Sequence, residues 1–87
     1  MDGRFEGRTV IVTGGSRGIG LAIASAFARE RARVVIASYD EARGQAAVRW
    51  LRDEGGLVAF VRTDVTRQPD VERMVESVLE RFGQIDV

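Results

Sequence analysis

Three short apolar runs stand out along the 87-residue chain, at residues 9–12, 33–37 and 57–61. They are rich in Val and Ile and do not alternate with polar residues. Strands that helices cover on both faces show this pattern, because neither face needs polar side chains. The pattern therefore predicts three buried strands.

Apolar residues at helical spacing follow the first two runs, so that each set forms one stripe of an amphipathic helix. The expected stripes are Ile19, Ile23, Ala26 and Phe27 in the first helix and Ala46, Ala47, Trp50 and Leu51 in the second. Two helices are thus predicted between the three strands.

A third helix has the clearest signals. Pro69 suits the first helical position, and Asp70 and Glu72 lie in the first turn, where the helix dipole favours anions. Gly83 is expected to end the helix. The apolar stripe between these ends consists of Val71, Met74, Val75, Val78, Leu79 and Phe82.

The order of strand and helix, repeated three times, indicates an α/β fold with a parallel sheet. Residues 85–87 follow as the opening of a fourth strand. Right-handed crossovers place the first two helices on one face of the sheet. If the fourth strand returns to the free side of the first, the third helix covers the other face, as in doubly wound folds. We expect a truncated Rossmann-type doubly wound sheet in one domain.

Composition narrows the class of protein. Apolar residues make up 45% and charged residues 30%, as in ordinary globular proteins, and no window approaches the roughly 20 apolar residues of a membrane span. The start of the chain lacks the apolar core of a secretory signal, so we expect a cytoplasmic protein. The net charge is zero with both signs interspersed, which argues against nucleic-acid and membrane partners.

Several residue types are missing altogether. All 13 basic residues are Arg, and the sequence has no Lys, His, Asn or Cys. A phosphate-loop NTPase needs Lys, a zinc site needs His or Cys, and a Ser-His or Cys-His nucleophile needs its base. These classes are excluded, and the remaining chemistry is binding through backbone, hydroxyl, carboxylate and guanidinium groups.

A glycine-rich segment, Thr-Gly-Gly-Ser-Arg-Gly-Ile-Gly at residues 13–20, joins the first strand to the first helix. Glycine takes a positive φ without penalty and lets backbone amides approach a diphosphate. The helix dipole adds roughly 0.3 to 2 kcal/mol for an anion. The spacing differs from the general Gly-x-Gly-x-x-Gly pattern. A tight turn without a ligand is the alternative.

The pattern Thr-Gly-x-x-x-Gly-Ile-Gly after the first strand resembles the glycine motif of the short-chain dehydrogenase/reductase family. The Asp-Val pair at residues 64–65 resembles the family's adenine contact, and residues 82–87 resemble its approach to the fourth strand. The three motifs occur in order over nearly the whole chain. The resemblance implies that residues 1–87 are the N-terminal part of a single NAD(P)-binding Rossmann domain, without identifying a substrate.

The resemblance also implies roles for individual residues. Asp64 has an alternative as the cap of a turn, and Ile19 has an alternative as a core residue. The implied set is Gly14, Gly18 and Gly20 at the diphosphate, Ser16 and Arg17 at the adenosine phosphates or ribose, Ile19 towards nicotinamide, and Asp64 and Val65 at adenine.

Cofactor preference depends on the end of the second strand. NAD users of the family place an acid there for the ribose hydroxyls, whereas this chain has Ser38. Arg17 is a cation that can pair with a 2′-phosphate, so NADP is favoured over NAD. Against this, Tyr39 stands where NADP users often carry Arg. Asp40 either serves as the ribose acid or caps the second helix.

One residue departs from the family pattern at the end of the first helix. Arg31 stands where the family commonly has Gly. An Arg in a left-handed cap costs about 1 kcal/mol. We therefore expect this helix to end in another way.

Catalysis in the family resembles proton transfer by a Tyr with a Lys four residues later and a Ser. Because the chain has no Lys, Tyr39 has no such partner, and we expect no catalytic residue and no activity in these 87 residues. The resemblance implies an oxidoreductase that transfers hydride between a nicotinamide cofactor and an alcohol or ketone, with homo-oligomers as in the family. A non-catalytic dinucleotide-binding or sensor module is the alternative.

Overall fold

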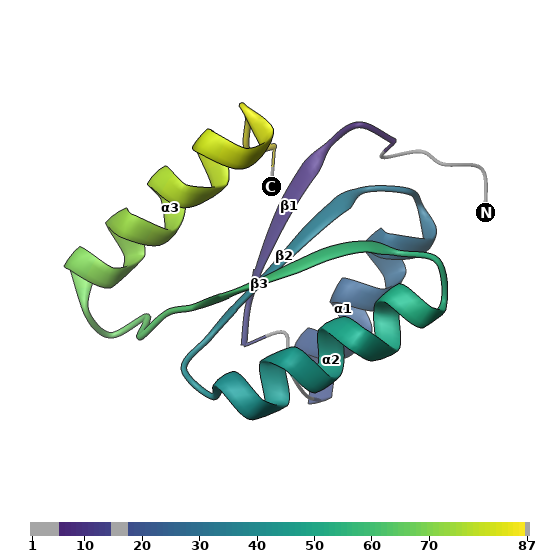
Figure 1. Cartoon of the computed structure of the whole chain (residues 1–87), viewed down its shortest axis with the longest axis horizontal. Coiled ribbons are helices and arrows are strands. Elements are labelled where there is room, and N and C mark those ends of the chain that lie inside the picture. The colour runs from purple at the N-terminus through teal and green to yellow at the C-terminus, as the bar shows by residue number, and fades with distance from the viewer. Residues whose placement is uncertain (1–5, 15–17, 87) are drawn as a thin grey trace.

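The computed structural model of the protein describes residues 6–14 and 18–86. Strands and helices alternate in this part of the chain, and the strands form a parallel sheet in the order β1-β2-β3 (Figure 1). The elements are β1 (Thr9–Thr13), α1 (Gly18–Arg29), β2 (Arg33–Ser38), α2 (Glu41–Asp53), β3 (Leu57–Arg62) and α3 (Gln68–Phe82). The predicted order of strands and helices is confirmed.

Helices cover both faces of the sheet. Helices α1 and α2 lie together on one face, and α3 lies on the other (Figure 1). Side chains alternate along β2, so that Val34 and Ile36 enter the core under α1 and α2, whereas Val35 and Ala37 pack against α3. The two-sided packing explains the unbroken apolar runs of the strands and confirms the doubly wound arrangement.

The segment after α3 returns to the free side of β1. The amide of Asp86 donates to the carbonyl of Thr9 at 2.8 Å, and the amide of Thr9 donates to the Asp86 carboxylate at 2.9 Å. Residues 84–86 form no strand, so the predicted fourth strand is absent from the described residues. Its predicted position beside β1 is nevertheless where the chain runs.

The apolar stripe predicted for α1 is wrong in its phase. Ile19 and Ile23 are 81% and 44% exposed, and Ala26 is exposed as well, while Phe27 is half-buried against the core. The residues that α1 buries are small ones, Ala24 and Ser25. Small side chains let the helix axis approach the sheet closely, which decides the buried face here more than hydrophobicity does.

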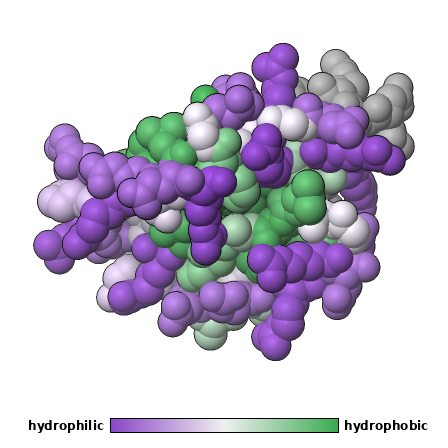
Figure 2. Space-filling model, turned by 45° about the horizontal axis from the view of Figure 1, so that its top comes forward, coloured by the Kyte–Doolittle hydropathy of each residue, from purple (hydrophilic) through white to green (hydrophobic). Residues whose placement is uncertain are grey.

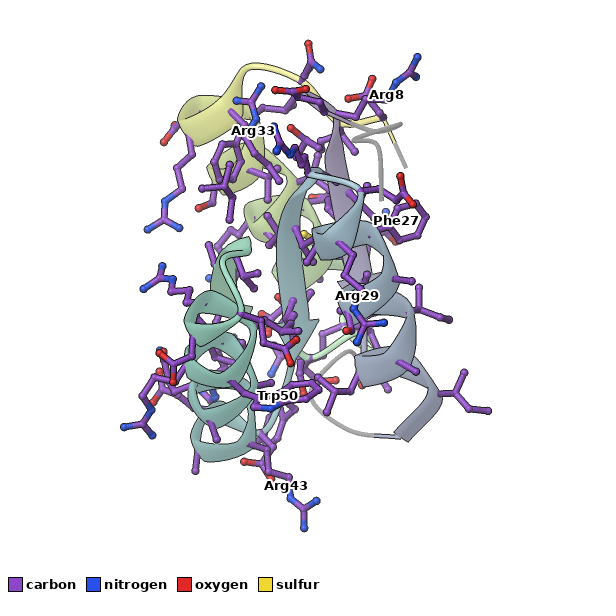
Figure 3. The ribbon with its side chains drawn as sticks, turned by 90° about the vertical axis from the view of Figure 1, so that its right-hand side faces the viewer. Arg8, Phe27, Arg29, Arg33, Arg43 and Trp50 are labelled. Atoms are coloured by element: carbon purple, nitrogen blue, oxygen red, sulfur yellow. The ribbon has the colours of Figure 1, made fainter. Side chains whose placement is uncertain are left out.

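The stripe predicted for α2 is half right. Ala47 and Leu51 are buried, but Ala46 is exposed and Trp50 lies at the surface with 48% exposure (Figure 3). Gly44 and Val48 complete the buried face. A Cβ atom at Gly44 would lie 2.1 Å from the ring of Phe60, so the helix contacts β3 through a position that has no side chain.

Helix α3 follows its prediction most closely. Met74 and Val78 are buried, and Val71, Val75 and Phe82 pack beside them, whereas Leu79 is 44% exposed. The helix starts one residue earlier than expected, which makes Pro69 its second residue. Gly83 ends the helix at φ 78°, as predicted. Large apolar side chains at helical spacing thus defined this face correctly.

Some large apolar side chains remain in contact with water. Figure 2 shows apolar surface in the middle of one face, framed by hydrophilic side chains. The exposed set includes Ile19, Ile23, Tyr39, Trp50, Leu57, Val65 and Leu79. The two cores therefore do not use all of the apolar residues of the chain.

Helix α1 ends with Arg31 in the left-handed conformation, which we did not expect for an arginine. Arg31 has φ 66° and donates its amide to Ala28 at 3.1 Å, while Ala32 donates to Phe27 at 3.2 Å. These two bonds form a Schellman motif, which satisfies carbonyls at the helix end. The expectation that the helix would end differently is wrong, because the short connection to β2 requires this turn whatever residue occupies it.

We expect Arg31→Gly to raise the free energy of unfolding by about 1 kcal/mol, since glycine relieves the left-handed strain. The ion pair that Arg31 makes with Glu6 is long, at 4.0 Å, and exposed, so its loss costs little. Urea denaturation would measure the change. Arg29→Gly, at the last residue of α1, is the control and should lower stability by at most about 1 kcal/mol. Equal effects of the two substitutions would refute the strain at Arg31.

Asp86 should make the fold sensitive to acid. The backbone amide of Thr9 holds the pKa of Asp86 below its ordinary value of 3.8, with Gln84 and the charges of Arg8 and Arg33 assisting. A carboxyl with a lowered folded pKa stabilises the fold above its unfolded pKa, and this stabilisation is lost as the pH falls through the folded pKa.

We expect Asp86→Asn to be less stable than the wild type at pH 6, because the amide oxygen of Asn accepts the hydrogen bond from Thr9 without the negative charge that strengthens it. Towards pH 2 the wild-type carboxyl loses this charge as well, so the two stabilities should approach each other. Urea denaturation across this range would show the two curves converging. Asp53→Asn, at the exposed end of α2, is the control. A constant gap between wild type and Asp86→Asn would contradict the assignment.

Candidate functional site

The loop after β1 lies at the carboxyl edge of the sheet and is tied to the neighbouring strand. The amide of Gly14 donates to the carbonyl of Ala37 at 2.9 Å. Gly14 and Gly18 have φ values of 66° and 60°, a region that other residues enter only with strain. A Cβ atom at either position would meet nothing within 4 Å among residues 6–14 and 18–86, so the described residues leave the space in front of this backbone open.

The beginning of α1 suits an anionic ligand. The first turn contains no acidic residue, and the amides at the start of a helix have no partner within the helix. Gly18 and Ile19 are exposed and Gly20 is half-buried, while Ser16 and Arg17 lie outside the described residues. Glycines with positive φ, helix-start amides that have no partner within the helix, and a first turn without acidic residues form a donor set that fits a phosphate group.

Ile19 belongs to the surface in this structure. Its side chain is 81% exposed, so the alternative of a core role is wrong. Its position at the beginning of α1 places it next to the open glycine loop.

The end of β2 brings three predicted residues to the same edge. Ser38 is half-buried, and its carbonyl accepts from the amide of Thr63 at 2.9 Å. Tyr39 is 62% exposed. Asp40 caps α2, because its carboxylate accepts from the amide of Arg43 at 3.0 Å and pairs with the Arg43 side chain at 3.3 Å. The cap interpretation of Asp40 is therefore confirmed.

Asp64 and Val65 follow β3, as expected. The Oδ1 atom of Asp64 accepts from the amide of Thr66 at 3.0 Å and from its hydroxyl at 2.5 Å. Asp64 thus caps the turn, which was its alternative role. Both bonds use one oxygen, so Oδ2 keeps the capacity to accept from a further donor. Val65 is 52% exposed beside it.

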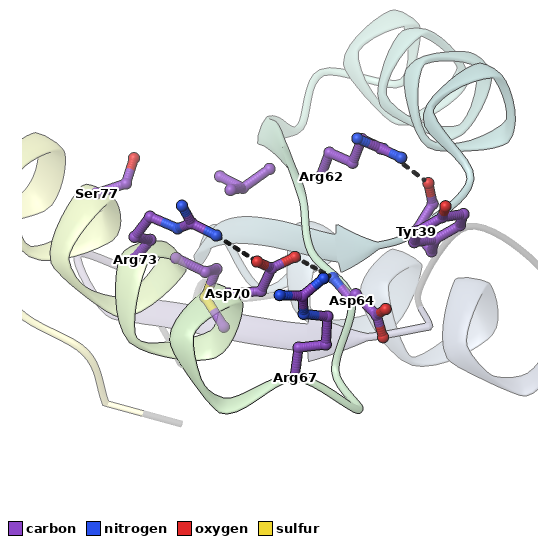
Figure 4. Close-up of a pocket in the computed structure, with 9 residues that line it drawn as sticks. Tyr39, Arg62, Asp64, Arg67, Asp70, Arg73 and Ser77 are labelled. Atoms are coloured by element: carbon purple, nitrogen blue, oxygen red, sulfur yellow. Dashed lines mark hydrogen bonds and ion pairs between the residues drawn. The ribbon is translucent and has the colours of Figure 1, made fainter.

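A cavity of about 600 Å³ opens between the end of β3 and α3 (Figure 4). Tyr39 and Asp64 line it, and among the described residues of the glycine segment none does. Asp70 anchors one wall, since its carboxylate accepts from the amide of Asp64 at 3.2 Å and pairs with Arg73. The Asp64 amide and the Arg73 guanidinium lower the pKa of Asp70. The turn after β3 is therefore fixed to the first turn of α3.

Three arginines of this cavity were missed by the sequence reasoning: Arg62, Arg67 and Arg73. Arg62 donates from Nε to the carbonyl of Tyr39 at 3.4 Å, and its guanidinium lies 4.7 Å from the centre of the Tyr39 ring. The parallel register pairs Arg62 with Ser38. Aligning the equally spaced apolar runs would have given this pairing from the sequence.

The described residues include neither a membrane-spanning helix nor a cluster of metal ligands. Within residues 6–14 and 18–86, no helix is long and apolar enough to cross a membrane. In the same part of the chain, no group of three acidic side chains gathers where it could hold a metal ion.

Comparisons with known proteins agree with this architecture. The sequence model of the short chain dehydrogenase family matches residues 8–87. L-fucose dehydrogenase of Bos taurus is 49% identical over 86 residues, which cover 99% of this chain and 30% of the relative. Among solved structures, gox2181 has a TM-score of 0.93 and 46% identity, with coverage of 97% of this chain and 33% of that one.

A short chain dehydrogenase/reductase from Burkholderia phymatum, described as a complex with NAD, is 34% identical with a TM-score of 0.89. It is covered over 29% of its length, and this chain over 93%. The chain thus spans about a third of the length of the relatives that it matches. By the family match over nearly all of its residues, the chain belongs to the short chain dehydrogenase family.

Proposed function

We propose that the chain is the NAD(P)-binding portion of an oxidoreductase that transfers hydride between a nicotinamide cofactor and an alcohol or ketone. The observation that carries the proposal is the open loop after β1. Gly14 and Gly18 have left-handed backbone, an added Cβ atom at either would meet none of the described residues within 4 Å, and Gly18 is the first residue of α1. The NAD complex of the Burkholderia relative supports the same ligand class.

In this proposal the loop binds the cofactor's diphosphate. Gly14, Gly18 and Gly20 let the backbone come close, and the first amides of α1 donate to the phosphate oxygens. Ser16 and Arg17 contribute a hydroxyl and a guanidinium at the adenosine phosphates or ribose. Charge-assisted hydrogen bonds of this kind are about twice as strong as neutral ones.

The other strand ends orient the rest of the cofactor. Ser38 and Tyr39 lie at the ribose, Asp64 and Val65 hold adenine, and Ile19 faces the nicotinamide side. The free Oδ2 of Asp64 suits the amino group of adenine. NADP is preferred over NAD, because no carboxylate at Ser38 repels a 2′-phosphate and Asp40 is paired with Arg43.

The bound cofactor carries the hydride, while this chain binds and orients the cofactor. The sequence contains no Lys, so it offers no Tyr-Lys pair for proton transfer, and we expect the 87 residues alone to be inactive. The proposal places the protein in the cytoplasm, as a homo-oligomer with a small-molecule substrate. It assigns no role to nucleic acid or membranes.

A second candidate is a non-catalytic dinucleotide sensor. Both candidates share the cofactor site and differ in turnover. An activity assay of the protein that carries this chain, with NADP and a panel of alcohols, separates them. Turnover supports the oxidoreductase, and tight binding without turnover supports the sensor.

Gly18→Val should lower the affinity of the chain for 5′-ADP at least tenfold, because the branched side chain occupies the approach of the diphosphate. Isothermal titration calorimetry would measure the change. Gly7→Val is the matched control, since Gly7 also has a positive φ, 81°, and no described residue within 4 Å of an added Cβ atom, but precedes β1 at the other edge of the sheet. Failure of the wild-type chain to bind 5′-ADP, or equal losses in both variants, would disprove the site.

A further inference from the structure

Arg62 stands beside Ser38 at the carboxyl edge of the sheet. The parallel register pairs the two residues, and paired strands lie about 4.8 Å apart. Ile36 and Phe60, two residues earlier on each strand, both enter the core under α1 and α2. Side chains repeat their direction every second residue, so Ser38 and Arg62 share this face. Arg62 therefore places a cation next to the residue at the ribose end of the proposed site.

Weak contacts hold the guanidinium in place. Nε donates to the Tyr39 carbonyl at a long 3.4 Å, and the Tyr39 ring lies 4.7 Å below the charge (Figure 4). Both contacts leave the terminal nitrogens of Arg62 available, because the backbone bond uses Nε. The stacked ring limits the rotation of the side chain without neutralising it. Arg62 is thus an oriented donor for an anion.

The ion pairs near Arg62 also leave its charge available for an anion. Arg43 and Arg73 are paired with Asp40 and Asp70, respectively. In the described part of the chain, no carboxylate forms an ion pair with Arg62. The positive charge at the end of β3 is therefore not compensated locally.

We propose that Arg62 binds the 2′-phosphate of NADP and determines the preference for this cofactor, with Tyr39 as its positioning residue. This inference rests on the proposed function. In dinucleotide folds an acid at the end of the second strand binds the ribose 2′-hydroxyl, or an arginine nearby accommodates the 2′-phosphate. Here the end of β2 carries Ser38, and the neighbouring strand supplies the arginine. Its planar donors match phosphate oxygens in pairs.

The test compares two isomers that differ only in the position of one phosphate. In titration calorimetry at 0.15 M salt, the wild-type chain should bind 2′,5′-ADP at least tenfold more tightly than 3′,5′-ADP. Arg62→Gln should lower the affinity for 2′,5′-ADP about tenfold and leave the affinity for 5′-ADP within twofold, because 5′-ADP lacks the 2′-phosphate. Arg62→Lys should recover part of the loss, since it keeps the charge but not the paired donors.

Arg81→Gln is the matched control, because it removes the same charge from the last turn of α3. It should change neither affinity. Equal binding of the two isomers, or an unchanged 2′,5′-ADP affinity in Arg62→Gln, overturns the inference and leaves the proposed function intact. Parallel losses of 5′-ADP and 2′,5′-ADP binding in Arg62→Gln also overturn it. Absence of binding to any adenine nucleotide overturns the proposed function and this inference with it.

Discussion

Parallel pairing of β1, β2 and β3 requires a crossover after every strand, because each strand must start again at the same edge of the sheet. All carboxyl ends therefore share the other edge. Gly14, Ser38, Arg62 and Asp64 meet there although they are far apart in the sequence. The candidate site is thus a direct consequence of the strand direction, and each of its parts comes from the residue at which a strand ends.

The same constraint explains which parts of the fold the sequence could predict. Runs of Val and Ile identified all three strands, and large apolar side chains identified the buried face of α3. The stripes of α1 and α2 were less accurate, because these helices contact the sheet through small residues such as Ala24 and Gly44. Hydrophobic periodicity gives little weight to glycine and alanine, so it assigned the wrong phase to α1.

The site was predictable where backbone conformation specifies the residue type, as at Gly14 and Gly18. The role of a site residue was less predictable where its side chain can either hydrogen-bond a nearby backbone group or contact a ligand. The carboxylates of Asp40 and Asp64 both accept hydrogen bonds from nearby backbone amides. The spacing of residues in the sequence could not show whether they would do so or would face a ligand. Arg62 was missed because its importance depends on the register with β2, a non-local property. At Arg31 the tertiary structure overrides the local preference: the short connection between α1 and β2 holds this residue in a left-handed conformation that arginine disfavours.

Three of the acidic residues serve the backbone of the fold. The carboxylates of Asp40, Asp70 and Asp86 all accept hydrogen bonds from backbone amides, which fix the start of α2, the turn after β3 and the segment beside β1. An acid that accepts such bonds is held within the fold and directs less of its charge at a ligand. Arginine cannot replace a carboxylate as a cap, because it has no acceptor. Arginine can instead donate to carbonyls, as Arg33 and Arg52 do, and Arg62 at the carboxyl edge keeps terminal donors that suit an anion.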